Sequence, residues 1–124
     1  MPQAKIEEQF VVRTIDATPA NVVQYTPPEE SMSYIILTAT AKCSDGGRAI
    51  LESEYGTERT GGAAPTILGT SSKTAWVSGS GNRCSLGLAI VGNELQFQVT
   101  GDAGLTVDWG INSDIQTVTY FPPA

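Results

Sequence analysis

Histidine is absent from the 124 residues, and cations are scarce: seven Lys and Arg stand against thirteen Asp and Glu, giving a net charge of −6. Without histidine the usual general base is missing, so the serine and cysteine triads in their common forms cannot be assembled. Without a basic surface, the chain has little with which to neutralise phosphates or anionic headgroups. We therefore expect neither nucleic acid nor a membrane as a partner.

Cysteine is nearly absent as well. Cys43 and Cys84 are the two cysteines of the chain, and neither belongs to a CxxC motif. Each lies in an apolar or alternating stretch, which favours two reduced, buried thiols over a disulfide. A metal site built from two cysteines and no histidine is the least favoured alternative.

Long hydrophobic runs are also missing. The first residues, 1–8, contain no apolar segment behind a positive stretch, and no later run reaches bilayer length. We therefore expect no signal peptide, synthesis in the cytoplasm and a soluble product. The length is that of one domain, and we expect residues 1–124 to form a single one.

What the sequence does contain is a regular alternation of turn residues with short segments of alternating polarity. Gly, Pro, Asn, Ser and Thr recur at intervals of roughly ten residues, the spacing of short antiparallel strands. No stretch of helical length shows a 3.6-residue apolar period. We predict an all-β, antiparallel two-sheet sandwich, jelly-roll-like, with about eight or nine short strands in consecutive hairpins.

The clearest predicted strand spans residues 32–42, and its apolar side chains on both faces predict a central strand buried on both sides. Ser44-Asp-Gly-Gly supplies a hairpin turn to a partner strand at 47–54. Residues 21–25 are predicted to form a brief strand or one helical turn. The other predicted strands are 5–15, 71–79, 83–91, 93–100, 105–111 and 115–121.

Two connecting segments and a possible arm complete the predicted layout, and the arm overlaps the predicted strand at 5–15. Residues 57–70 are rich in small residues and are expected to form a long exposed loop. Residues 1–12 could extend as an N-terminal arm, and Asn112-Ser-Asp is expected to turn the chain between the last two strands. The loop and the arm are our candidates for reaching a neighbouring subunit.

Paired carboxylates are the remaining catalytic possibility. Glu52 and Glu54 lie two residues apart on one strand face, which resembles a retaining glycosidase pair in spacing. The solvent face of a hairpin produces the same arrangement, and this is the preferred interpretation. We expect no catalytic residues and no enzymatic activity.

Three aspartates near turns raise the question of a metal. Asp102, Asp108 and Asp114, with Asn112 beside the last, could gather around a hard cation such as calcium. Turn chemistry accounts for Asp102 and Asp114 without a metal, because Asp bonds its own backbone in turns. We expect neither a metal site nor a cofactor site.

The two tryptophans differ in their surroundings. Trp109 alternates with Val107 and Ile111, which predicts a core position. Trp76 lies between Ala75 and Val77 after a polar run, where a core or subunit-interface position is preferred over ligand stacking.

A larger pattern covers residues 74–120. It comprises AWV at 75–77, NELQFQVTG at 93–101, TVDWGI at 106–111 and QTVTY at 116–120. This order of strands resembles a recurrent small β-sandwich module of tailed bacteriophages, found in capsid decoration (cement) proteins, head fibres and tail-fibre modules. The resemblance carries no catalytic residues with it.

The resemblance implies a structural protein of the virus particle. We expect first a decoration protein on the capsid exterior, which binds the major capsid protein, stabilises the shell and forms a homo-oligomer, with a trimer favoured. The lack of a stalk segment favours this role over the alternative, a tail-fibre or head-fibre module that binds a receptor or glycan. A carboxylate glycosidase ranks third. The candidate interface residues are Phe10, Val12, Tyr55, Arg59, Ile67, Leu68 and Trp76.

Overall fold

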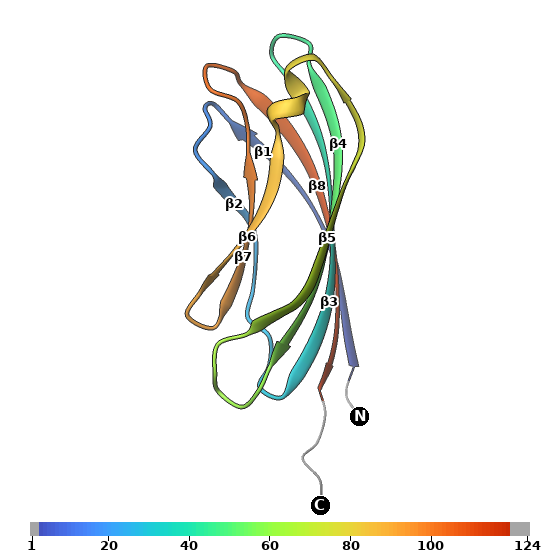
Figure 1. Ribbon diagram of the computed structural model, residues 1–124, viewed down its shortest axis with the longest axis vertical. Helices are drawn as coiled ribbons and strands as arrows, with labels where there is room; N and C mark the ends of the chain where they lie inside the picture. Colours follow the sequence, from blue (N-terminus) through green and yellow to red (C-terminus); the bar gives the residue numbers. More distant parts are fainter. Residues whose placement is uncertain (1–2, 120–124) are drawn as a thin grey trace, which may run out of the picture.

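The chain folds into two antiparallel β-sheets packed face to face (Figure 1). A computed structural model describes residues 3–119, with residues 3–10 described by their backbone alone. The strands are β1 (Gln3–Thr14), β2 (Ala20–Tyr25), β3 (Ser31–Cys43), β4 (Arg48–Arg59), β5 (Thr66–Ser78), β6 (Ser85–Val91), β7 (Glu94–Thr100) and β8 (Val107–Thr119), and a 3₁₀ helix, η1 (Gly79–Arg83), precedes β6. The predicted all-β sandwich is confirmed.

The strands divide unequally between the sheets. The larger sheet has the order β1-β8-β3-β4-β5, and the smaller has the order β2-β7-β6. The first strand thus pairs with the last and the second with the seventh, which wraps the two sheets around one core. Hairpins join β3, β4 and β5 in one sheet and β6 and β7 in the other. The other connections cross between sheets, so the predicted succession of hairpins is wrong.

Several strands, above all β4, β5 and β8, are also longer than predicted. The expected turn at residues 112–114 does not form, because β8 pairs with β1 on one side and β3 on the other through this segment. Ser113 lies opposite Leu37 and is fully buried. Ladder bonds on both sides outweigh the local turn preference of Asn, Ser and Asp.

The predicted loop at 57–70 is largely strand. β4 continues to Arg59 and β5 begins at Thr66, so residues 60–65 alone connect them. Small Thr and Ser side chains suit a solvated edge strand, and here they pair with β4 along its length. The segment is therefore an edge of the larger sheet rather than a free excursion.

The predicted N-terminal arm is corrected in the same way. From Gln3 to Thr14 the backbone pairs with β8, so most of the arm forms the opposite edge of the larger sheet. Residues 1–2 lie outside the described residues. A segment paired over this length is not free to reach a neighbouring subunit.

The core lies between the sheets and is built from alternate residues of each strand. Ile35, Leu37 and Ala39 of β3 face inward and are fully buried, whereas Tyr34 on the other face is 44% exposed. β3 is central, as predicted, but it is covered on one face rather than two, because the smaller sheet covers the inner face of the larger. Trp109 is 1% exposed, which confirms its predicted core position.

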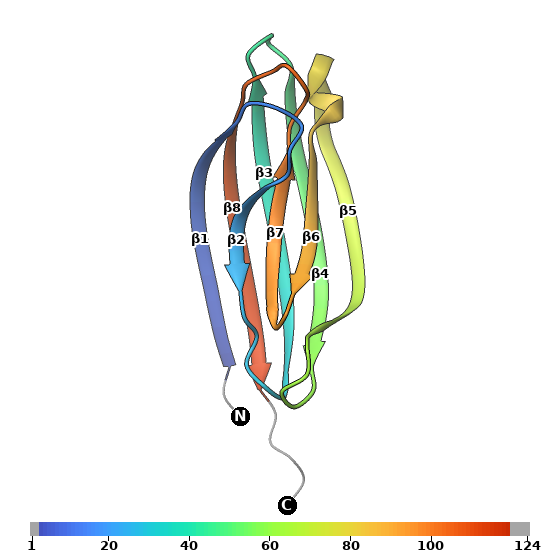
Figure 2. The same ribbon diagram turned by 90° about the vertical axis from the view of Figure 1, so that its left-hand side faces the viewer.

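The three strands of the smaller sheet cannot cover all five strands of the larger sheet. Figure 2 shows β1 and β5 lying beyond the two edges of the smaller sheet. β5 is consequently exposed along almost its whole length, on inward-facing and outward-facing positions alike. The described residues contain no helix that is long and apolar enough to cross a membrane.

Candidate functional site

The outer face of the larger sheet is hollowed near the turn that joins β3 to β4. Thr40 of β3 lies directly opposite Gly110 of β8. At this point one strand therefore has a small side chain and its neighbour has none. A hollow of about 650 Å³ results, and we call it the outer hollow. It is lined by Val11, Thr40, Ala41, Lys42, Arg48, Ala49, Ile50, Trp76, Asp108, Trp109 and Gly110.

Apolar side chains on this face are unusually accessible. Val11 is 90% exposed, Trp76 50% and Ile50 39%. They come from β1, β5 and β4, which the sheet order spreads across its full width. Gly110 and Thr40 separate Val11 from Ile50, so the apolar groups stand on opposite sides of the hollow. Exposed apolar patches often mark interaction surfaces.

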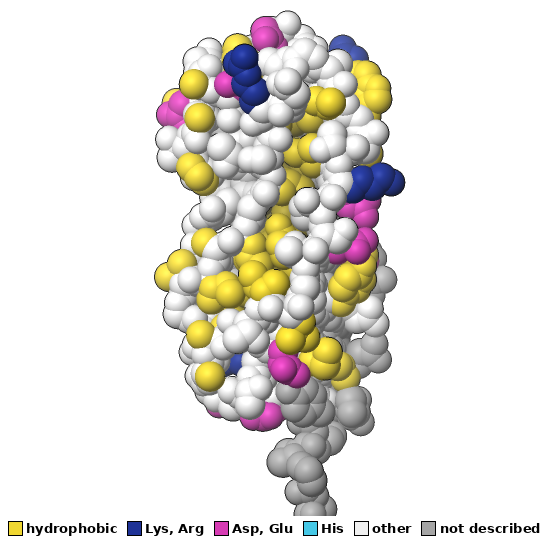
Figure 3. Space-filling view, in the orientation of Figure 1, with side chains coloured by type: hydrophobic (Ala, Val, Ile, Leu, Met, Phe, Trp, Pro, Cys, Tyr) yellow, Lys and Arg dark blue, Asp and Glu magenta, His cyan; other side chains and the backbone are white. Residues whose placement is uncertain are grey.

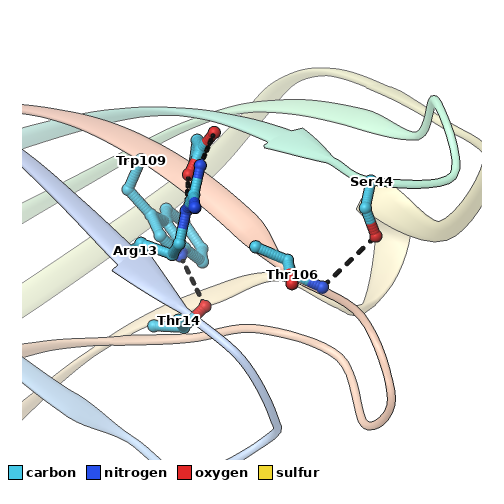
Figure 4. A network of polar contacts seen from close by, with 6 residues as sticks. Arg13, Thr14, Ser44, Thr106 and Trp109 are labelled. Carbon is cyan, nitrogen blue, oxygen red and sulfur yellow. Dashed lines mark hydrogen bonds and ion pairs between the residues drawn. The ribbon is translucent and has the colours of Figure 1, made fainter.

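Charged groups complete the outer hollow. Lys42, Arg48 and Asp108 lie among its lining residues. The Arg13 guanidinium donates to both carboxylate oxygens of Asp108, at 2.7 and 3.1 Å (Figure 4). This hydrogen bond holds the pKa of Asp108 below its usual range and raises the pKa of Arg13. The site therefore offers an aromatic ring, apolar contacts and both signs of charge.

The same strands fix the outer hollow from within. Thr14 follows Arg13 on β1 and points to the other side of the sheet, where its Oγ1 accepts a hydrogen bond from Trp109 Nε1 at 3.0 Å (Figure 4). The buried indole is thus paired, and its ring lies beneath the outer hollow. Arg13 and Thr14 therefore link the surface to the core, because Arg13 binds Asp108 at the surface and Thr14 binds the buried Trp109.

A second accessible apolar surface follows the open side of the sandwich. Figure 3 shows apolar side chains forming a stripe along the long axis on the side of β5 and β6. Leu51, Cys84 and Leu86 line a hollow of about 170 Å³ between the two sheets there. On β5 itself, Leu68 is 54% exposed and Ile67 44%.

The structure separates the seven predicted interface residues. Ile67, Leu68 and Trp76 share β5 and are exposed. Val12 is half-buried against the core. The side chain of Phe10 lies outside the described residues.

Tyr55 and Arg59 are corrected, because both point into the interior. The Tyr55 ring packs against Phe97, with 5.5 Å between ring centroids. The Arg59 guanidinium donates to the carbonyl oxygens of Pro27 at 2.8 Å, Ala63 at 2.9 Å and Gly62 at 3.4 Å. Both side chains alternate inward along β4 with Leu51, a pattern that the shorter predicted strand concealed.

Sequence reasoning missed most of the outer hollow. Val11 and Ile50 were read as ordinary strand residues, and Lys42 and Arg48 received no role. Alternation places Val11 and Ile50 on the solvent face, and both side chains are exposed. The signal that could have identified the outer hollow was the presence of apolar residues at positions where alternation predicts solvent exposure.

The carboxylate pair lies on the outer face of β4. Glu52 and Glu54 are half-buried. Burial, together with a hydrogen bond to Glu54, raises the pKa of Tyr34. A shallow hollow of about 260 Å³ adjoins Glu54, where Gly56 lies opposite Gly69. The glycosidase hypothesis stays a prediction.

The aspartates considered for a cation are held by different partners. Asp102 is nearly buried and accepts a hydrogen bond from Arg83 at 2.9 Å, and Asp108 accepts from Arg13. Among the side chains that the structure describes, those of residues 11–119, no three or more from His, Cys, Asp or Glu are grouped to hold a metal ion.

The cysteines are free, buried thiols, as predicted. Cys43 ends β3 and Cys84 precedes β6, so they approach one another between the two sheets, where the thiols form a hydrogen bond. Burial, and then the neighbouring Cys43, raises the pKa of Cys84 to about 12.

No protein-family model matches the chain, and no curated protein sequence matches it. Among solved structures, the chain is similar to the tailspike protein gp49 from Acinetobacter baumannii bacteriophage Fri1, a capsular polysaccharide depolymerase. The similarity has a TM-score of 0.40 and 11% sequence identity, and covers 89% of this chain and 17% of that one. The depolymerase activity is that of the much longer protein.

Proposed function

We propose that this chain is a structural protein of a tailed bacteriophage particle that acts by binding, and that it decorates the capsid exterior through the major capsid protein. The strand pattern of residues 74–120 supports the first part. The observation that carries the second is the outer hollow, where Val11, Ile50 and Trp76 expose apolar surface on a rigid sheet.

The outer hollow suits a protein partner. Aromatic and Arg side chains are enriched at the centre of interfaces, and Trp76 and Arg48 line one rim together. A sheet held by ladder bonds on both sides of β8, β3 and β4 keeps these groups in place before binding. Binding to the assembled shell but not to its separated subunits raises shell stability by mass action.

The test is co-sedimentation of the purified protein with shells that lack it, followed by heating of bare and decorated shells. Stoichiometric binding that raises the temperature of shell disruption is the expected result. The double variant Val11→Ser, Ile50→Ser should weaken binding by about tenfold or more. Val91→Ser removes a similarly exposed side chain from β6 and serves as the matched control.

Two outcomes would contradict this proposal. Failure of the unaltered protein to bind shells would remove the decoration role. Equal losses in the double variant and in Val91→Ser would show that the outer hollow is not the contact surface.

A receptor- or glycan-binding module is the second candidate, favoured by one observation. The half-exposed Trp76 ring borders a hollow of about 650 Å³ that also contains Asp108 and Arg48. Hollows of this size, with an aromatic wall and a few polar groups, suit small ligands. A glycan array tests it: binding that Trp76→Phe keeps and Trp76→Ala loses would favour this role, and no binding by the unaltered protein would remove it.

A further inference from the structure

β5 is an edge strand with few of the features that keep such edges apart: two register irregularities, at Leu68 and Ala75, and one lysine. It is thirteen residues long, contains no proline and pairs with β4 alone among the described strands. Lys73 is its single charged residue, whereas β1, the other edge of the same sheet, contains Lys5, Glu7, Glu8 and Arg13. Natural sheets protect exposed edges with charge, proline or short length.

Two copies of β5 that pair in antiparallel orientation place complementary side chains opposite one another. With Ser72 as the centre, antiparallel pairing of two copies sets Ile67 against Val77 and Leu68 against Trp76. All four side chains are exposed in the single chain, by between 38% and 54%. The remaining pairs match small with small and polar with polar: Gly69 with Ala75, Thr70 with Thr74, and Ser71 with Lys73.

The backbone permits this pairing. The register of β5 with β4 is irregular at Leu68 and at Ala75, and residues 69–74 between them are regular. When Ser72 pairs with Ser72 of the second copy, residues that face inward in one copy lie opposite residues that face inward in the other, as an antiparallel sheet requires. In the regular segment, Thr70, Ser72 and Thr74 lie opposite the buried Tyr55, Ser53 and Leu51 of β4, so they share one face.

We infer that two copies of this chain associate through their β5 edges, antiparallel and about a twofold axis at Ser72, which joins the two larger sheets into one. Such an interface is isologous, because each residue i meets residue 144 − i of the other copy. Ladder hydrogen bonds supply the affinity, and the apolar pairs at the two ends fix the register.

The other edges fit a second copy less well. β1 is charged, and β2 is six residues long. β6 is seven residues long, and its Leu86 and Leu88 already pack against the core. The twofold contact also differs from the trimer that the phage resemblance implies, so the two expectations give different masses in solution.

Pairing would alter the rim of the outer hollow. Trp76 faces the same side of the sheet as Ile50, which lies opposite it on β4. Leu68 of the second copy would lie beside the indole and extend the apolar wall across the junction. Each dimer would then present two outer hollows on one continuous face.

Sedimentation velocity of the purified full chain over a range of concentrations tests the inference. A reversible dimer is expected. Ser72→Lys and Ser72→Glu should each raise the dissociation constant by at least about tenfold, because residue 72 meets its own copy and either sign of charge repels itself. An equimolar mixture of the two variants should regain a dimer that contains one copy of each.

The control is Ile15→Lys, which places the same charge on an exposed apolar position after β1 and should leave the dimer unchanged. Amide exchange of the unaltered protein gives a second measurement: β5 amides should exchange more slowly as concentration rises. A monomer or trimer at about 0.1 mM, a dimer kept by both Ser72 variants, or a mixture that fails to pair would each overturn the inference. None of these outcomes depends on binding to shells.

Discussion

At the scale of single residues, Cys84 shows how packing suppresses the chemistry of a thiol. Its side chain is 6% exposed, and burial raises its pKa from 9.0 to about 12. At pH 8 the thiolate fraction is therefore far lower than for an unperturbed thiol. We predict that alkylation of Cys84 in the folded protein is slower than in urea by about a hundredfold or more, as measured by mass spectrometry of the labelled peptide.

The same pKa has a consequence for stability. A folded-state pKa above the unfolded value stabilises the protein fully below pH 9, and this contribution is lost as pH rises toward about 12. The free energy of unfolding of the parent should therefore fall more steeply between these values than that of Cys84→Ala. Parallel curves for the two proteins would contradict the assignment.

Gly81 and Gly87 differ in the space that an added Cβ atom would have. A Cβ on Gly81 would lie 2.0 Å from the carbonyl oxygen of Arg48, whereas nothing lies within 4 Å of a Cβ on Gly87. We predict that Gly81→Ala lowers the free energy of unfolding by about 1–3 kcal/mol, because backbone must move to admit it. Gly87→Ala should change it by less than about 0.5 kcal/mol. Equal effects in thermal unfolding would contradict this.

At the scale of elements, Arg59 holds the turn between β4 and β5. Its guanidinium reaches three backbone carbonyls, in residues 27, 62 and 63, and is 8% exposed. A lysine has one ammonium group and cannot reproduce this fork. We predict that Arg59→Lys costs about 1–3 kcal/mol and speeds amide exchange in residues 60–65.

Arg48→Lys is the control for that measurement, since Arg48 is exposed. It should leave stability within about 0.5 kcal/mol of the parent and leave exchange in the turn unchanged. If Arg59→Lys behaves like Arg48→Lys, the guanidinium does not hold the turn.

The elements also show where sequence reasoning ends. The Ser44-Asp-Gly-Gly turn was correctly predicted, because Gly46 takes a φ of 95° and Asp45 Oδ1 accepts a bond from the Gly47 amide at 3.0 Å. The same kind of turn signal at residues 112–114 gave a wrong prediction, because that segment pairs with a strand on each side. A turn signal decides the backbone where no partner strand competes for its hydrogen bonds.

At the scale of the whole molecule, charge opposes association of two copies. Each chain has a net charge of −6, and Glu52, Glu54 and Glu58 lie on β4 beside the proposed junction. Salt screens this repulsion, with a Debye length that falls from about 14 Å at 0.05 M to about 4 Å at 0.5 M. We predict that the dimer dissociation constant decreases several-fold over this range.

Sedimentation equilibrium at the two salt concentrations measures this effect. A dimer that weakens as salt rises would indicate attractive charge pairs across the junction instead. That result would contradict a contact made by ladder bonds and apolar ends.

The candidate site was predictable in part. Trp76 was named from the sequence as an interface residue and lines the outer hollow. Leu68 and Ile67 were also named, and they are exposed on the same strand but do not line the hollow. Val11, Lys42 and the other groups of the outer hollow come from strands far apart in sequence, and the sheet order β1-β8-β3-β4-β5 alone brings them together.

The sequence by itself determined the strand character of the chain, the inward positions of Trp109, Phe97 and Leu95, and the tight turn at residues 44–47, because alternation and turn chemistry are local properties. The tertiary structure alone decided how far the strands extend, that five strands face three, and that β5 remains an open edge. These features depend on hydrogen-bond partners distant in sequence, whose choice is settled only when the two sheets close over a common core.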